Sequence, residues 1–308
     1  MVEIFEWQTF PRQQPLPPAI EAAIPACRLL RTAFGLVAVW LAASALTMID
    51  VKSRVAAARV PLNEPSPQFM LWGDSHADAL TFLFRDLASE YHVTGKWFVG
   101  SELVPLVEAY SRLKPANRVT ERVMDEVQVG QVPYVFIIAR WDWRVPRWHP
   151  TVHDEGWELR ALRDDSSTEQ SLADSTRVLS RALPRTINAL SVANPSLKRI
   201  YFLNQIPCRD GERPISEGTY KIQQSGIFAA LSLCKCDKLT VLNADWFREG
   251  MSRNGDEDGC YYFDSNHISS HGARTLVRPL LEPIFKEMSE WTRTTSMGVR
   301  LAATGNGL

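Results

Sequence analysis

The chain has 308 residues, of which 45% are hydrophobic and 22% charged, so it is long enough for one large domain or two small ones with a sizeable core. Its formal net charge of −1 at pH 7 argues against binding that is driven by neutralisation of nucleic-acid phosphates, so no nucleic-acid partner is expected. The five cysteines are an odd number, and at least one thiol therefore has no partner within the chain.

The first predicted element is a transmembrane helix over residues 32–49. The stretch AFGLVAVWLAASALTMI (33–49) carries no charge and falls within the usual length range for a membrane helix. A buried core helix is one alternative, and a signal peptide is another, because Ala43-Ser44-Ala45 resembles a cleavage site. The long segment before it favours an uncleaved anchor. Basic residues balance on the two sides, so charge does not predict the orientation.

The rest of the chain divides into further segments. Residues 1–31 are an N-terminal segment, 50–67 a polar linker rich in proline, 68–291 a folded domain and 292–308 a flexible tail. Within the domain, short apolar runs alternate with helical patterns, which indicates right-handed crossovers and a three-layer α/β fold with a central parallel sheet. The predicted strands are FMLWG (69–73), HVTGKWFVG (92–100), PYVFIIARW (133–141), KRIYFLNQI (198–206) and KLTVLNAD (238–245).

Three helical stripes lie between or after these strands. The first covers residues 80–91, and the second covers 172–183, where Pro184 is expected to end or kink the helix. The last covers 273–284 and contains two prolines, which predicts an imperfect helix.

The first strand ends at Gly73-Asp74-Ser75-His76, directly before a helix. Gly73 permits a tight turn there. The first N–H groups of the helix would point into the crevice at the strand ends, together with the positive end of the helix dipole. This arrangement suits an oxyanion formed at a carbonyl that Ser75 attacks. The alternative is that Asp74 or Ser75 only caps the helix.

A second motif lies near the other end of the chain, in YYFDSNHISSHGA (261–273), where Asp264 precedes His267 by three residues. Histidine is the usual base for a serine hydroxyl, because its ordinary pKa lies near neutrality. A carboxylate on the other ring nitrogen fixes the tautomer and stabilises the imidazolium. A surface turn with a capping aspartate is the alternative. In combination with the first motif, the pattern favours a catalytic triad of Ser75, His267 and Asp264.

The two motifs carry a family resemblance. Gly73-Asp74-Ser75-His76 resembles the first block of the SGNH (GDSL) hydrolases, and residues 264–269 resemble their last block. With Gln205-Ile206-Pro207, they are similar to the SGNH domain fused behind membrane acyltransferases that O-acylate bacterial cell-surface polysaccharides, over about residues 65–290. VEIFEWQTFPRQQ (2–14) resembles, more weakly, a loop before the last membrane helices of that fusion. The chain is therefore expected to be the C-terminal portion of such a protein or a stand-alone relative with one span.

The resemblance implies a flavodoxin-like SGNH domain preceded by one transmembrane helix. It implies that Ser75 is the nucleophile, His267 the base and Asp264 its orienter, in O-acyl (expected to be acetyl) transfer to a bacterial polysaccharide through an acyl-serine. A carbohydrate esterase and an inactive membrane-tethered glycan-binding module are the alternatives. The expected partners are a glycan acceptor, the membrane and a multi-span acyltransferase domain that supplies the acyl donor. No cofactor is predicted, and the domain is expected on the periplasmic side of the inner membrane.

The resemblance also implies an oxyanion hole built from the Ser75 N–H, a glycine after the second strand and an asparagine after the third. Gly100 matches the glycine. The third strand is followed instead by Ala139-Arg140-Trp141-Asp142-Trp143. Trp141 is predicted as the third donor, where an indole or guanidinium N–H could act. The alternative is that Ser75 and Gly100 suffice.

Tryptophan and arginine are concentrated in RWDWRVPRWHP (140–150). Flat rings stack on sugar faces, and arginine binds carboxylates through two hydrogen bonds. Arg140, Trp141 and Trp143 are therefore predicted to bind the substrate in a glycan groove. The alternative is a loop that is anchored by aromatic packing.

Four cysteines, Cys208, Cys234, Cys236 and Cys260, follow the predicted membrane helix, and Cys27 precedes it. If the helix crosses a membrane into an oxidising compartment, the four can form disulfides, whose connectivity the sequence does not determine. A zinc site is the alternative, but the spacing departs from the usual patterns, and no metal is predicted.

Overall fold

The structure is a computed structural model of the chain, and it describes residues 66–111, 118–141, 162–166, 172–210, 213–214, 216–250 and 254–304. All of these lie in the compact unit Asn63–Leu308. The predicted N-terminal segment, the predicted membrane helix and most of the linker fall outside the described residues. Across the described ranges, no helix has both the length and the apolar character needed to cross a membrane.

A five-stranded parallel sheet forms the middle of the domain, in the order β2-β1-β3-β4-β7. The strands are β1 (Phe69–Gly73), β2 (Gly95–Val99), β3 (Tyr134–Ile138), β4 (Arg199–Leu203) and β7 (Leu239–Leu242). Every predicted strand is present, and each after the first is shorter than its predicted run. This is the strand order of flavodoxin-like folds, in which the order reverses between the first strand and its neighbour.

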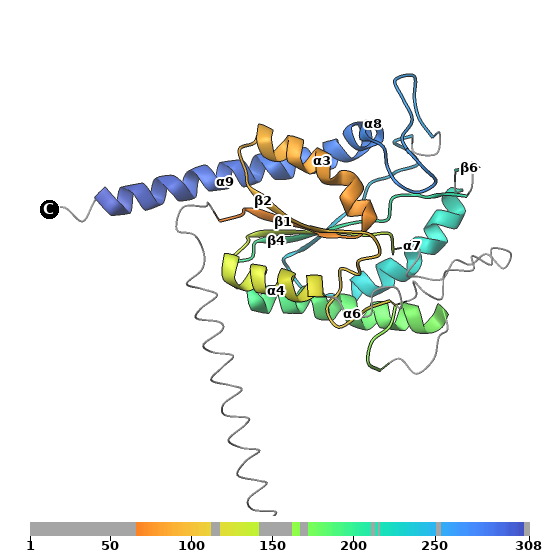
Figure 1. The fold of residues 1–308 in the computed structure, drawn as a ribbon, viewed down its shortest axis with the longest axis horizontal. Coiled ribbons are helices and arrows are strands. Elements are labelled where there is room, and N and C mark those ends of the chain that lie inside the picture. Colours follow the sequence, from red (N-terminus) through yellow and green to blue (C-terminus); the bar gives the residue numbers. More distant parts are fainter. Residues whose placement is uncertain are drawn as a thin grey trace, which may run out of the picture. The chain divides into compact units, whose positions relative to one another are not determined.

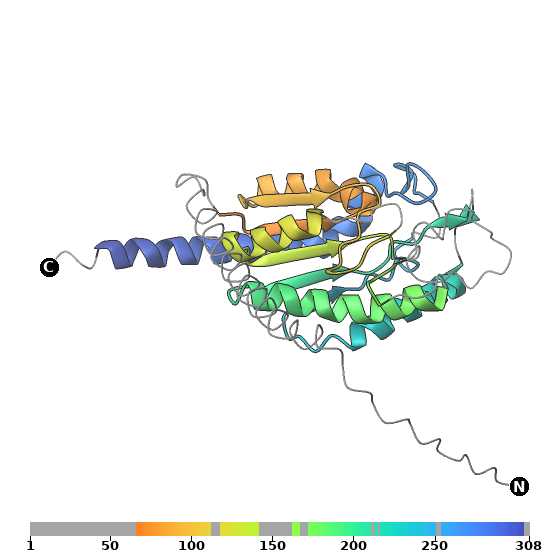
Figure 2. The same ribbon diagram turned by 60° about the horizontal axis from the view of Figure 1, so that its bottom comes forward.

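Helices cover both faces of the sheet, so the three-layer prediction is confirmed (Figures 1 and 2). One face carries α3 (Ser75–Glu90) and α9 (Arg278–Thr304), the latter preceded by the short α8 (Ser270–Gly272) and a π-helical turn, Ala273–Val277. The other face carries α4 (Arg118–Gly130), α6 (Leu172–Ala193) and most of the buried side of α7 (Glu217–Ser232). Two short antiparallel strands, β5 (Arg209–Asp210) and β6 (Arg213–Pro214), form a separate pair.

A hydrophobic core lies on each face of the sheet, and strand β1 contributes side chains to both, because successive side chains of a strand point to opposite faces. Phe69 and Leu71 pack into the core beneath α3 and α9, and Met70 and Trp72 pack into the core above α4 and α6. All four side chains are 0% exposed. The central strand is therefore fixed from both sides, and so is the position of the turn that follows it.

Two helices run further than the sequence predicts. Helix α6 does not end at Pro184 but continues to Ala193, and its later residues Ile187 and Leu190 are buried. Continued burial of this apolar face offsets the backbone hydrogen bond that proline removes. Helix α9 extends to Thr304, so most of the predicted flexible tail beyond residue 291 is helical.

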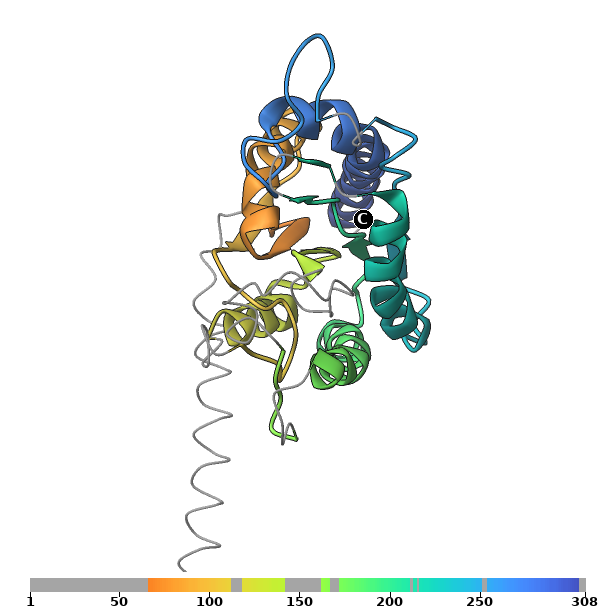
Figure 3. The same ribbon diagram turned by 90° about the vertical axis from the view of Figure 1, so that its right-hand side faces the viewer.

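Gly73 ends β1 at a point where the backbone passes very close to its neighbours. A Cβ atom at this position would lie 1.8 Å from the Ile138 carbonyl oxygen and 2.5 Å from the Ala77 Cβ. Only glycine fits, and the turn into α3 therefore lies directly against the end of β3. This is the switch point of the sheet, where ligand groups gather in open α/β folds. Figure 3 looks onto this edge of the domain.

We expect Gly73→Ala to lower the free energy of unfolding by about 3 kcal/mol, the upper end of the usual cost of overpacking. Chemical denaturation monitored by tryptophan fluorescence measures this. Gly218→Ala is the matched control, because nothing lies within 4 Å of the added Cβ. Equal denaturation midpoints for the two variants would contradict the close packing at Gly73.

Candidate active site

Asp74 shapes the turn that carries the candidate nucleophile. Its carboxylate is 3% exposed and caps α3, since Oδ1 accepts a hydrogen bond of 2.9 Å from the His76 N–H. The other oxygen, Oδ2, accepts a hydrogen bond of 2.8 Å from the Arg140 N–H, just after β3. One carboxylate thus holds the β1–α3 turn to the neighbouring strand end. The capping role falls to Asp74, which leaves the Ser75 hydroxyl available for another partner.

The three predicted catalytic residues lie together at the carboxyl edge of the sheet. Ser75 Oγ is 2.8 Å from His267 Nε2, and His267 Nδ1 is 2.6 Å from Asp264 Oδ2. Ser75 is the first residue of α3, and the other two belong to the loop that leads into α8, which lies beside the start of α3 (Figure 3). The geometry matches that of a nucleophile, a base and the carboxylate that orients the base.

Backbone hydrogen bonds fix the Asp264 carboxylate within this loop. Its Oδ1 accepts from the Asn266 N–H at 2.8 Å and from the His267 N–H at 2.7 Å, while Oδ2 faces the imidazole. Burial raises the pKa of Asp264, but these two N–H groups and the His267 ring lower it more, so the net pKa lies below its ordinary value. The carboxylate that orients His267 is therefore held in its charged form.

Two further rings contact His267. Phe263 stacks on the imidazole, with ring centroids 5.4 Å apart and an interplanar angle of 10°. His76 meets it edge-on at 5.2 Å and 67°, and His76 Nε2 is 3.3 Å from Asn266 Oδ1. His76 therefore connects the nucleophile turn to the loop that carries the base. These roles were not predicted from the sequence, although Phe263 stands directly beside Asp264 and His76 directly beside Ser75.

The site is ordered by hydrogen bonds yet open to solvent. The side chains of His267 and Asp264 are 21% and 40% exposed, and Ser75 is half-buried. A substrate can therefore reach the serine hydroxyl without displacement of a packed layer. The arrangement is suited to nucleophilic attack on an acyl carbonyl, with His267 receiving the serine proton.

The three predicted oxyanion donors are placed differently. Ser75 begins α3, and helix geometry gives the first N–H groups no acceptor within the helix. The Gly100 N–H donates to the Gly73 carbonyl oxygen through a long bond of 3.3 Å. The Trp141 N–H donates to Gln205 Oε1 at 2.5 Å, so this amide is already engaged. The buried indole N–H of Trp141 has no hydrogen-bond partner among the described residues, and its role as a donor stays a prediction.

The predicted glycan groove is not formed by the residues that the structure describes there. Trp141 is 0% exposed and stacks on Phe202, with centroids 4.9 Å apart, and Arg140 is 5% exposed. Packing encloses both side chains, so the prediction that the Trp141 ring offers a face to a sugar is wrong. Trp143 lies outside the described residues.

The structure does not join Cys208, Cys234, Cys236 and Cys260, which could pair in an oxidising compartment, by disulfides. Cys234 Sγ points to the Ala230 carbonyl oxygen, and Cys236 Sγ lies 3.4 Å from Ser191 Oγ. Across the described ranges, no group of three or more His, Cys, Asp or Glu side chains is arranged to hold a metal ion.

A second histidine–aspartate pair lies close to the triad in sequence. His271 Nε2 is 2.7 Å from Asp256 Oδ1, and the His271 ring stacks on Tyr261 at 5.7 Å. Tyr261 also donates to Asp256, at 3.1 Å. This pair joins the turn around residues 254–260 to the start of the last helical segment.

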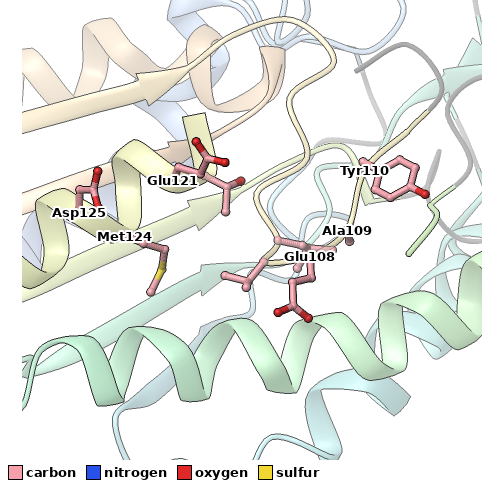
Figure 4. Close-up of a pocket in the computed structure, with 9 residues that line it drawn as sticks. Glu108, Ala109, Tyr110, Glu121, Met124 and Asp125 are labelled. Carbon is pink, nitrogen blue, oxygen red and sulfur yellow. The ribbon is translucent and has the colours of Figure 1, made fainter. Parts of the chain in front are cut away.

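A pocket of about 460 Å³ lies between the β2–α4 connection and α4 (Figure 4). Residues 106–110 form one wall, and Thr120, Glu121, Met124 and Asp125 form the other. Its rim is acidic, and Glu108 forms an ion pair with Arg185. None of the triad residues lines it, so the pocket is separate from the space around Ser75.

Comparison with protein families gives one match. The family model described as "SGNH domain (fused to AT3 domains)" covers residues 50–282, which include the β1–α3 turn and the loop of Asp264 and His267. No curated protein matches the chain.

Several solved structures are similar in fold. One from Parabacteroides merdae, described as a GDSL-like lipase, is 11% identical with a TM-score of 0.45 and covers 73% of this chain and 97% of its own. A catalytic mutant of an acetylxylan esterase from Geobacillus stearothermophilus is 13% identical with a TM-score of 0.40, and the match covers 71% of this chain and 95% of the esterase. A family two carbohydrate esterase from Cellvibrio japonicus is 11% identical with a TM-score of 0.39, and the match covers 74% of this chain and 63% of that esterase.

We expect Asp264→Asn to reduce the dependence of stability on pH. Because the folded pKa of Asp264 is lowered, its charged form stabilises the fold above the ordinary aspartate pKa of about 4, and this stabilisation is lost as the pH falls through the lower folded pKa. Urea denaturation of both proteins at several pH values measures this. The wild-type chain should exceed the variant in unfolding free energy above about pH 5, with the difference shrinking toward about pH 3. A difference that is constant with pH would exclude this role.

We expect His76→Ala and Asn266→Ala each to lower kcat for an activated acetyl ester by about 10- to 100-fold, because each frees the loop that positions His267. KM should change little. The double variant should be no worse than the more damaged single variant, since both remove the same contact. Losses that multiply in the double variant would show that the two side chains act independently.

Proposed function

The chain belongs to the family of SGNH domains that are fused to AT3 domains, and on this premise we propose that it is a serine-dependent O-acyltransferase. The proposed reaction moves an acyl group, expected to be acetyl, to a hydroxyl of a bacterial cell-surface polysaccharide. The observation that carries the proposal is the hydrogen bond of 2.8 Å between Ser75 Oγ and His267 Nε2. It places a base on the hydroxyl of a solvent-accessible serine, which is the requirement for nucleophilic acyl chemistry.

In the first half of the reaction, Ser75 Oγ attacks the acyl carbonyl of the donor while His267 Nε2 takes its proton. Asp264 stabilises the imidazolium that results and keeps the ring in the required tautomer. The tetrahedral intermediate then expels the leaving group of the donor, which receives the proton from His267. The product of this half is acyl-Ser75.

In the second half, a sugar hydroxyl of the acceptor replaces the leaving group. His267 takes its proton as the oxygen attacks the acyl carbonyl, and the proton returns to Ser75 Oγ as the acyl bond breaks. The acceptor leaves as an ester and the serine is regenerated. Both halves use the same base, so the position of His267 controls both rates.

The oxyanion is proposed to lie at the start of α3. The N–H of Ser75 and the positive end of the helix dipole support negative charge there. Gly100 is proposed as a second donor, because its present bond to Gly73 is long and the space around its Cα is open. A developing oxyanion is a stronger acceptor than a peptide carbonyl.

The proposal extends to location and partners. The predicted helix 32–49 anchors the domain to the inner membrane, with the catalytic domain on the periplasmic side. A multi-span membrane acyltransferase domain supplies the acyl donor, and the polysaccharide is the acceptor. The description of the matching family, fused to AT3 domains, supports this arrangement.

Ester hydrolysis is the second candidate function, and the exposure of the site favours it. With His267 and Asp264 21% and 40% exposed, water can reach the acyl-serine. The same residues would then act as a carbohydrate esterase, with water in place of the sugar hydroxyl. A binding module with an unused triad is the remaining alternative.

We expect Ser75→Ala to lower kcat for an activated acetyl ester by about 10⁴-fold or more, because no other group in the site replaces the nucleophile. Ester cleavage and covalent labelling by a fluorophosphonate probe measure this in the full chain. Ser225→Ala, which removes an exposed serine of α7, is the matched control and should keep full activity. Wild-type activity in the Ser75 variant would end the enzymatic proposal.

The products distinguish transfer from hydrolysis. We expect acetylated oligosaccharide to form at the expense of free acetate as the acceptor concentration rises, because sugar and water compete for one acyl-serine. Mass spectrometry of the saccharide and an acetate assay measure the two products. Free acetate as sole product at every acceptor level would favour the esterase.

A further inference from the structure

Three consecutive aromatic residues precede Asp264, and they have different surroundings. Tyr261 and Tyr262 are 5% and 6% exposed, whereas Phe263 is 65% exposed. The two tyrosine hydroxyls are satisfied, since Tyr261 donates to Asp256 at 3.1 Å and Tyr262 donates to the Pro207 carbonyl oxygen at 2.5 Å. Phe263 is therefore the residue of this group that turns outward, and its ring has no polar atom that would favour contact with water.

The exposure of Phe263 occurs on a fixed backbone. Its N–H donates to the His267 carbonyl oxygen at 3.2 Å, and Tyr262 pairs with Ile268 in an antiparallel bridge on either side of the loop. The backbone N–H groups that bind Asp264 tighten the same loop. The loop thus holds a large apolar ring in water at a defined position, which costs free energy relative to burial.

That position is beside the base of the triad. The rings of Phe263 and His267 are nearly parallel, at 10°, with centroids 5.4 Å apart, which is a displaced stack. The phenyl ring therefore extends the imidazole surface rather than covering it, and His267 stays 21% exposed. A ligand that lies on the phenyl ring is brought to the base, whose Nε2 faces Ser75 Oγ.

We propose that Phe263 is the platform for the acceptor, and that a pyranose ring of the saccharide packs its C–H face on the exposed phenyl ring. This inference rests on the proposed acyl transfer. The phenyl ring contacts His267, the group that must deprotonate the acceptor hydroxyl, so it serves the second half of the reaction. A pyranose combines an apolar face for the ring with hydroxyls at its edge for the base, which neither water nor a small alcohol offers.

The test is the partition of acetyl-Ser75 between acceptor and water. The full chain is given p-nitrophenyl acetate as donor and, as acceptors, xylotriose, cellotriose and chitotriose in parallel, with glycerol as an alcohol that has no ring face. We expect Phe263→Ala to lower the ratio of transfer to hydrolysis by about 10-fold for the trisaccharides, with an unchanged ratio for glycerol. Phe263→Trp should retain transfer, because it keeps an aromatic face.

Two controls separate this role from simple support of the imidazole. Hydrolysis of p-nitrophenyl acetate without acceptor measures how much Phe263 supports His267, and in Phe263→Ala transfer to the trisaccharides should fall about 10-fold further than this hydrolysis does. Ile222→Ala removes another exposed apolar side chain, on α7, that is 52% exposed. It should leave the ratio of transfer to hydrolysis unchanged for the trisaccharides and for glycerol. If Phe263→Ala lost transfer and hydrolysis equally, or kept the wild-type ratio for the trisaccharides, the role of Phe263 as a platform would be overturned while the acyl-transfer proposal would stand. A wild-type chain that acetylates none of the saccharides would instead overturn the acyl-transfer proposal and this inference with it.

Discussion

The hydrogen bond between Ser75 Oγ and His267 Nε2 is the contact on which the chemistry of this domain depends. It joins residues 192 positions apart in sequence. The parallel sheet makes the contact possible, because the carboxyl ends of all strands meet at one edge. Gly73 positions Ser75 by letting β1 turn directly against β3. The Tyr262–Ile268 bridge positions His267 by closing the loop that carries it.

Helix capping and nucleophilic attack are assigned to two different residues, Asp74 and Ser75. The Asp74 carboxylate caps α3 through the His76 N–H and binds the Arg140 N–H, so the turn is fixed by a residue other than the serine. A serine that capped its own helix would have its oxygen committed to backbone N–H groups. Here the cap and the hydroxyl that faces His267 belong to successive residues, and the turn is held without restraining the hydroxyl.

His267 is held on several sides while its reactive edge stays open. Asp264 binds Nδ1, Phe263 stacks on the ring and His76 meets it edge-on. Such prior ordering lowers the reorganisation that a proton transfer requires. Exposure of the same site gives water access to an acyl-serine, so in the proposed transferase the choice of acceptor depends on binding of the saccharide rather than on exclusion of water.

The sequence by itself determined the five strands, the position of Ser75 at the end of β1 and the spacing of Asp264 and His267, because apolar runs, glycine turns and short loops reflect local backbone preferences. It predicted that Asp264 and His267 meet Ser75, but not that Phe263 and His76 pack against the imidazole, nor that Asp256 and His271 form a second pair nearby. Nor did it determine that Trp141 is enclosed while Phe263 is exposed. Only the tertiary structure decided these, because they depend on the order of the strands and on packing between segments far apart in the chain.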